Sequence, residues 1–213
     1  MCENSVRTEQ TRFLLLYASQ TGQAEAIARR LNNAALEQGF LPDLHCASTF
    51  GCEFDLSKEN CVVLVTSTTD EGLVPEKARR FLRYLRKAAD GLLNGVKYAI
   101  LGLGDTNYNN FCNGCRTFDS HFEALGAVRF YETGYADDAV GLEIVVEPWV
   151  AGLWSALRSS LPTKMTAEIQ GQQCLPASKC WREIPYEVFP GNVCRAHTPA
   201  NERSAGFCGI RRA

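Results

Sequence analysis

The feature that most constrains the fold is the junction at residues 13–31, where an apolar run, a polar loop and a helical pattern follow one another. Residues 13–18 are continuously apolar, which predicts a strand buried on both faces of a parallel sheet. Apolar residues then recur at helical spacing from residue 24 to residue 31, which predicts a helix. Backbone N–H groups of the intervening loop meet a helix N-terminus there, an arrangement that favours anions.

The loop of residues 19–23 contains no lysine and the junction contains no GxGxxG motif. Neither a nucleoside triphosphate nor a dinucleotide is therefore the expected ligand, and a single terminal phosphate fits better. The alternative is a strand-to-helix turn that binds nothing.

The same alternation of strand, polar loop and helix continues along the chain. We expect further strands at residues 40–46, 61–66, 98–103 and 128–131. Residues 132–138 read as a loop, and the last helix is expected at about 141–161, with Pro148 kinking it or marking its start. This pattern predicts an α/β fold, a flavodoxin-like doubly wound five-stranded parallel sheet in the order 2-1-3-4-5. The loops after the first, third and fourth strands would then surround one pocket.

Composition is that of a globular protein, with a formal net charge of −2 and no apolar run near the 20 residues that cross a bilayer. We expect a cytoplasmic protein with no bulk attraction for nucleic acid and no membrane segment. Its ten cysteines are expected to be free thiols, and no metal site and no catalytic residues are predicted. The basic residues of 79–87 read as a solvated helix face.

Three regions are expected along the chain. Residues 1–11 form a polar lead-in, and residues 12–161 form the flavodoxin-like domain. Residues 162–213 have irregular composition with several prolines and cysteines, which predicts a disordered tail. We do not expect this tail to hold a further FAD-binding or nicotinamide-binding module.

Four segments of the sequence resemble one family. They are FLLLYASQTGQAEAIA, STTDEG, LGLGDTNYNNFCNG and YETGYADDAVGLEIVVEPWVAGLW. Together they are similar to the FMN-binding domain of the diflavin reductases, over about residues 13–161. The resemblance implies FMN as the cofactor and single-electron transfer as the activity.

The resemblance also implies a role for each matched residue. The FMN phosphate would be held by Ser19, Gln20, Thr21, Gly22, Gln23 and Ala24. The isoalloxazine ring would lie between Ser67, Thr68 and Thr69 on one side and Leu103, Gly104, Asp105, Tyr108, Phe111 and Asn113 on the other. Tyr108 matches the position whose ring stacks on the flavin, where a flat aromatic face covers the apolar ring system. Asp138 is expected at the flavin edge and completes the set of cofactor-binding residues.

Two departures from the family pattern stand near the ring. Thr69 replaces a frequent aromatic residue, and Asp70 replaces a glycine. The pair Cys112 and Cys115 spells C-x-x-C within the flavin loop, where a redox dithiol is the less favoured reading. Asp137 and Asp138 are expected to gather at the rim and to dock a basic face of a partner.

As partners, the resemblance implies cobalamin-bearing methionine synthase and an FAD/NADPH reductase module. We expect this chain not to oxidise NADPH without that module. Two alternatives stay open: a free-standing flavodoxin-type carrier that serves another acceptor, and a flavin-free interaction module.

Overall fold

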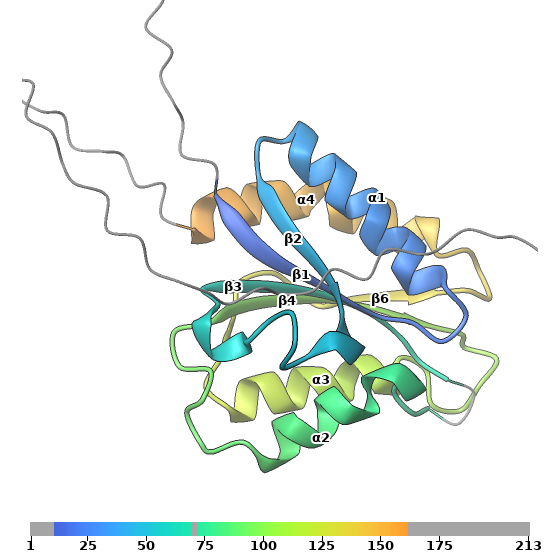
Figure 1. Ribbon diagram of the computed structural model, residues 1–213. Helices are drawn as coiled ribbons and strands as arrows, with labels where there is room; N and C mark the ends of the chain where they lie inside the picture. The colour runs from blue at the N-terminus through green and yellow to red at the C-terminus, as the bar shows by residue number, and fades with distance from the viewer. Residues whose placement is uncertain (1–10, 70–71, 162–213) are drawn as a thin grey trace, which may run out of the picture. The chain divides into compact units, whose positions relative to one another are not determined.

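A computed structural model describes residues 11–69 and 72–161 of the 213-residue chain (Figure 1). The tail expected at 162–213 and nearly all of the lead-in expected at 1–11 lie outside the described residues. The sheet is parallel throughout, with strands in the order β2-β1-β3-β4-β5 and with β6 also pairing with β4. The strands are β1 (Arg12–Ala18), β2 (Leu41–Cys46), β3 (Cys61–Ser67), β4 (Lys97–Gly104), β5 (Val128–Arg129) and β6 (Gly134–Asp137). The predicted strand order is confirmed.

Helices cover both faces of this sheet. They are α1 (Gln23–Glu37), α2 (Arg79–Lys87), α3 (Asn113–Ala124) and α4 (Glu143–Ser160). In Figure 1, α1 and α4 lie on one face, and α2 and α3 lie on the other. The buried side chains form two clusters that match these two layers, as the doubly wound architecture requires.

The alternation along β1 shows how the sequence makes both layers at once. Leu14 and Leu16 belong to the cluster under α2 and α3, whereas Phe13 and Leu15 belong to the cluster under α1 and α4. All four are at most 1% exposed. Because successive side chains of a strand point to opposite faces, a continuous apolar run is what a strand covered on both sides needs.

The fifth strand position differs from the sequence prediction because it is divided. β5 pairs with the start of β4 through Val128 and Arg129, and β6 pairs with its end, from Leu101 to Gly104. The prediction of a loop at residues 132–138 is therefore wrong, because most of this segment forms strand β6. Residues 130–133 interrupt the ladder between the two pieces.

Two helix boundaries also differ from prediction. The segment from about Arg116 to Leu125 is predicted as a helix from the sequence, and in the structure α3 begins three residues earlier, at Asn113. α4 begins at Glu143 and contains Pro148 within its length, so the reading of Pro148 as the helix start is wrong. Pro75 precedes a 3-10 turn at Glu76–Ala78, and α2 follows directly.

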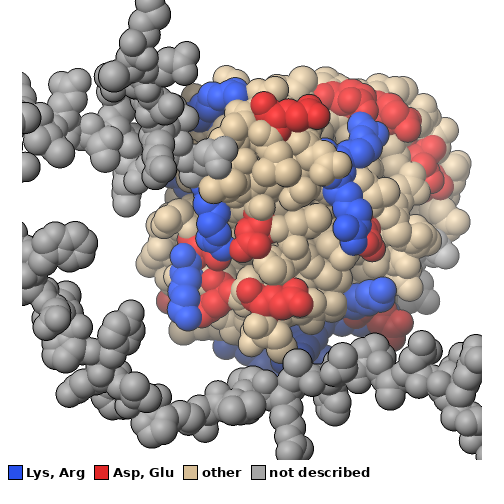
Figure 2. All heavy atoms as spheres, turned by 45° about the horizontal axis from the view of Figure 1, so that its top comes forward, with Lys and Arg blue, Asp and Glu red and all other residues tan. Residues whose placement is uncertain are grey.

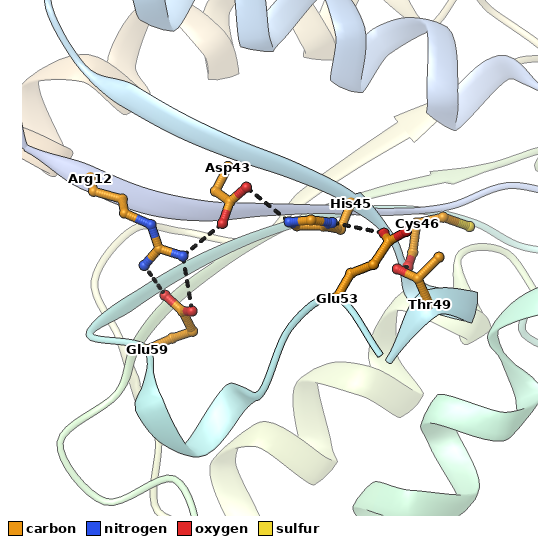
Figure 3. A network of polar contacts seen from close by, with 7 residues as sticks. All are labelled: Arg12, Asp43, His45, Cys46, Thr49, Glu53 and Glu59. Atoms are coloured by element: carbon orange, nitrogen blue, oxygen red, sulfur yellow. Dashed lines mark hydrogen bonds and ion pairs between the residues drawn. The ribbon is translucent and has the colours of Figure 1, made fainter. Parts of the chain in front are cut away.

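A chain of polar contacts ties the exposed edge strand β2 to its neighbours (Figure 3). Arg12 on β1 donates to Asp43 on β2 at 2.7 Å and to Glu59 at 2.7 Å. His45 lies between Asp43 and Glu53, at 2.8 and 3.0 Å. Partial burial raises the pKa of Asp43, but hydrogen bonding from Arg12 and the charge of His45 outweigh it, so the pKa lies below its ordinary value.

Within the described residues, no helix is long and apolar enough to cross a membrane, and no group of side chains is arranged to hold a metal ion. The cysteines of this part are free thiols, as expected: Cys46, Cys52, Cys61, Cys112 and Cys115.

Candidate functional site

A pocket of about 220 Å³ lies at the carboxyl ends of β1, β3 and β4. This is the edge where the order of the parallel strands reverses, and open α/β sheets bind ligands there. Its lining residues are Thr21, Gln23, Ser67, Thr68, Thr69, Leu103, Gly104, Asp105, Tyr108, Asn110, Asp138 and Leu142. The predicted convergence of the three loops is therefore observed.

The loop between β1 and α1 presents a helix N-terminus to the pocket. Gly22 is the N-cap residue, with a φ of 102° and no side-chain capping bond, a conformation that favours glycine. Ser19 turns its Oγ inward and accepts a hydrogen bond from the Gly22 N–H at 2.9 Å. No side chain caps the first turn of α1, so its N–H groups suit an anion such as a phosphate.

The loop after β3 contributes the most informative atom of the site. The Thr68 N–H donates to the Leu103 carbonyl at 3.0 Å, which fixes this loop beside β4. Among the described residues, the Thr68 Oγ1 is the one buried side-chain nitrogen or oxygen that has no hydrogen-bond partner. Buried polar groups are almost always paired, so this unpaired hydroxyl is unusual, and it belongs to a residue that lines the pocket.

The loop after β4 supplies the aromatic side of the pocket. Tyr108 lines the pocket and is 47% exposed, so the protein leaves about half of this residue uncovered. Gly104 is required because a Cβ there would lie 2.7 Å from the Cys112 backbone nitrogen. This close approach brings the end of β4 and the start of α3 together.

Contacts between the loops also fix the mouth of the pocket. The Asn113 side chain donates from Nδ2 to the Gly72 carbonyl at 2.8 Å. A Cβ on Gly72 would lie 2.3 Å from the Cβ of Asn110. The loops after β3 and β4 therefore pack directly against each other at this point.

Six of the residues predicted to hold the cofactor do not line this pocket. Ala24 is fully buried in the core. Gln20 accepts a hydrogen bond from the Glu76 N–H at 3.0 Å and faces a neighbouring cleft. The other four are Ser19, Gly22, Phe111 and Asn113, which shape or brace the loops.

Two residues that line the pocket, Asn110 and Leu142, were not predicted as cofactor-binding residues from the sequence. Asn110 belongs to the LGLGDTNYNNFCNG segment. Its position in that loop could have indicated that it lines the pocket. Leu142 precedes α4 and is 5% exposed. Leu142 lies in the connection between β6 and α4. The sequence prediction placed the pocket at the loops after the first, third and fourth strands, and this connection is not one of them.

The two acidic residues expected at the rim have different surroundings. The Asp137 carboxylate accepts hydrogen bonds from the Thr106 N–H and hydroxyl, at 3.0 and 2.7 Å, and from the Ala139 N–H at 3.0 Å. The hydrogen bonds from Thr106 lower the pKa of Asp137. Asp138 lines the pocket, and its N–H donates to the Gly104 carbonyl at 2.8 Å. The Asp137 side chain thus links the loop after β4 to the connection that follows β6.

Comparison with known proteins agrees with this fold. The model of the flavodoxin family matches residues 15–149, and the chain therefore belongs to the flavodoxin family. A flavodoxin from Pseudomonas aeruginosa, solved as a cysteine-to-alanine mutant, superposes with a TM-score of 0.62 at 23% identity, covering 70% of this chain and 99% of that one. The structural likeness shows the shared fold.

Among curated proteins, methionine synthase reductase from Bos taurus is 44% identical over 175 residues, which cover 81% of this chain and 25% of that protein. The protein of the same name from Homo sapiens is 49% identical over 150 residues, covering 69% of this chain and 21% of that protein. The chain thus spans about a quarter of the length of these relatives. Family and relatives together define an FMN-binding electron-transfer domain.

Proposed function

We propose that this domain passes electrons from an FAD/NADPH reductase module to cobalamin-bearing methionine synthase. The similarity to the methionine synthase reductases of cattle and humans supports these partners. The observation that carries the proposal is the pocket itself, in which three strand-end loops meet, one of them through Thr68, whose buried hydroxyl has no partner among the described residues.

In this proposal, different residues of the pocket bind different parts of FMN. Thr21, Gln23 and the N–H groups of the first turn of α1 hold the phosphate by charge-assisted hydrogen bonds. Thr68 donates its hydroxyl to a polar atom of the cofactor. Tyr108 covers the flat ring and excludes water from one face.

When bound, FMN supplies the capacity to take up and release electrons one at a time. The protein contributes position and surroundings. Asp137 joins the loop after β4 to the connection that follows β6, and Asn113 joins the loop after β4 to Gly72. These two contacts keep the ring-binding loops at a fixed separation.

A paired affinity measurement tests the cofactor assignment. The flavin-free protein should bind FMN at least about tenfold more tightly than riboflavin, because a charged hydrogen bond contributes about 1.5–3 kcal/mol. Thr21→Asp should weaken FMN binding by placing a carboxylate against the phosphate, and it should leave riboflavin binding nearly unchanged. Equal affinities for the two flavins would exclude the phosphate assignment of the α1 loop.

A free-standing electron carrier is the second candidate function. The match to a flavodoxin over 99% of its length favours it, because that protein has the fold of the described part of this chain and little besides. The two candidates differ in their acceptor. After chemical reduction, the domain we propose should reduce the cobalamin of purified methionine synthase, whereas a carrier for another acceptor should not.

A further inference from the structure

The outer face of α2 and of the short turn before it is strongly basic. Every charged residue of this segment except Glu76 is a cation, and all of them are exposed. We call this set the α2 basic face: Lys77, Arg79, Arg80, Arg83, Arg86 and Lys87. The opposite side of the helix is buried in the core through Phe81, Leu82 and Leu85. The cations therefore stand together on one side of the domain.

Several cations elsewhere in the domain have acidic partners. Arg29 pairs with Glu25 at 2.7 Å, and Arg30 on α1 pairs with Glu147 on α4. The face that carries α1 and α4 accordingly shows acidic and basic side chains side by side (Figure 2). Within residues 11–69 and 72–161, no cation of the α2 basic face forms a salt bridge.

The neighbouring helix α3 does not offset this charge. It meets α2 through His121, whose Nε2 lies 3.5 Å from the Arg86 Nε. Partial burial lowers the pKa of His121, and the charge of Arg86 lowers it further. Asp119 of α3 is used by Tyr98, at 2.7 Å, and by Arg129, at 3.0 Å. The α2 basic face thus keeps an unbalanced positive charge in a chain whose net charge is −2.

One end of the α2 basic face reaches the cofactor pocket. Arg79 lines a cleft together with Thr21, Thr68 and Thr69, all of which also line the main pocket. A hydrogen bond from the Glu76 N–H to Gln20 joins the start of this segment to the phosphate loop. A partner seated on α2 would therefore lie beside the flavin, where an electron acceptor must come close.

We propose that the α2 basic face docks an acidic protein surface of the electron acceptor, an inference that rests on the proposed function for the role of that partner. Opposite charge accelerates encounter and fixes orientation. A membrane surface fits less well, because none of the exposed large apolar residues lies within residues 76–87. A long nucleic acid fits less well, because α2 has only nine residues and the chain as a whole is acidic.

The test measures binding of fluorescein-labelled polyglutamate to the full chain by fluorescence anisotropy at low ionic strength. The variant Arg80→Gln/Arg83→Gln removes two cations that have no salt bridge with a described residue. The variant Arg29→Gln/Arg30→Gln changes the net charge equally on the α1 face and is the control. We expect the α2 variant to bind about fivefold more weakly than wild type, and the control to bind as wild type does. Added salt should remove the difference.

Equal affinities of the two variants would overturn the proposal. So would tighter binding of duplex DNA, or of phosphatidylserine vesicles, than of polyglutamate under the same conditions, because the partner would then belong to another class. Flavin absorbance is recorded on the same samples. A chain that binds no FMN but discriminates the variants would refute the proposed function and leave the docking surface standing, and the reverse result would refute the surface alone.

Discussion

The unpartnered hydroxyl of Thr68 allows a prediction in which one substitution changes stability and cofactor affinity in opposite senses. Valine has nearly the shape of threonine and keeps the β-branched geometry, so Thr68→Val removes the hydroxyl and little else. The Thr68 N–H bond to the Leu103 carbonyl is made by the backbone and is retained. The structure therefore isolates a single polar atom for the experiment.

The magnitude follows from the surroundings of that atom. In the flavin-free protein the Thr68 Oγ1 is buried without a partner among the described residues, and such a hydroxyl costs about 1–3 kcal/mol. Removing it should stabilise the flavin-free protein by about 1 kcal/mol, equivalent to a rise in Tm of about 2–4 °C for a protein of this size. In the FMN-bound protein the same change deletes a hydrogen bond worth about 1–2 kcal/mol, a loss of affinity of about 5- to 30-fold.

Thr66 provides the matched control. It lies two residues earlier, on β3, is fully buried, and its hydroxyl donates to the Ser67 carbonyl at 3.2 Å. It does not line the pocket. Thr66→Val should therefore lower the Tm of the flavin-free protein, because a satisfied hydrogen bond is lost, and it should leave FMN affinity unchanged.

The assay combines thermal unfolding of the flavin-free proteins with titration of FMN fluorescence. The reasoning is refuted if Thr68→Val lowers Tm as Thr66→Val does, since the hydroxyl would then be satisfied. It is also refuted if Thr68→Val binds FMN as wild type does. The first result would show that the hydroxyl is paired in the flavin-free protein, and the second that it makes no hydrogen bond to FMN.

Two further predictions concern the ring-binding loop and the sheet edge. Tyr108→Ala should weaken FMN binding and raise the fluorescence of the bound flavin, because a stacked tyrosine quenches it; unchanged fluorescence of the bound flavin would leave Tyr108 a packing role. Asp43 has a lowered folded-state pKa, so its contribution to stability is complete above the ordinary pKa of 3.8 and is lost as pH falls through the lower folded value. Urea unfolding below about pH 4 should accordingly show a smaller loss of stability with acid in Asp43→Asn than in wild type; equal acid sensitivity would contradict the role of the Arg12 contact.

Most of the sheet could be predicted because its central strands are buried on both faces. Burial of β1, β3 and β4 demands uninterrupted apolar runs, and those runs are plain in the sequence. The sequence also indicates the edge position of β2, because Pro42 lacks an N–H and an edge strand tolerates that loss. In the structure Pro42 stands opposite Phe13 on β1. The loops of the pocket could be located for the same reason, since each begins where an apolar run ends.

β6 could not be predicted because it is short and only half of it is buried. Its four residues alternate between buried and half-exposed positions, which leaves no apolar run to recognise. Gly134 looks like a loop residue, yet it is required by packing: a Cβ there would lie 2.7 Å from the Leu101 Cδ1 and 2.8 Å from the Trp149 Cδ1. Trp149 belongs to α4. The need for glycine at position 134 therefore arises from tertiary packing, and the sequence around Gly134 does not reveal it.

The two cysteines of the C-x-x-C pair show a similar limit, since the spacing alone suits both a redox dithiol and a helix start. In the structure both side chains are fully buried free thiols. Burial raises the pKa of Cys112 to about 12, which keeps it protonated and unreactive. A Cβ on Gly102 would lie 2.4 Å from the Cβ of Cys115, and one on Gly104 would lie 2.8 Å from the Sγ of Cys112. The two cysteines therefore fill the space that two glycines of β4 leave open, and this fit packs α3 against the strand whose following loop lines the pocket.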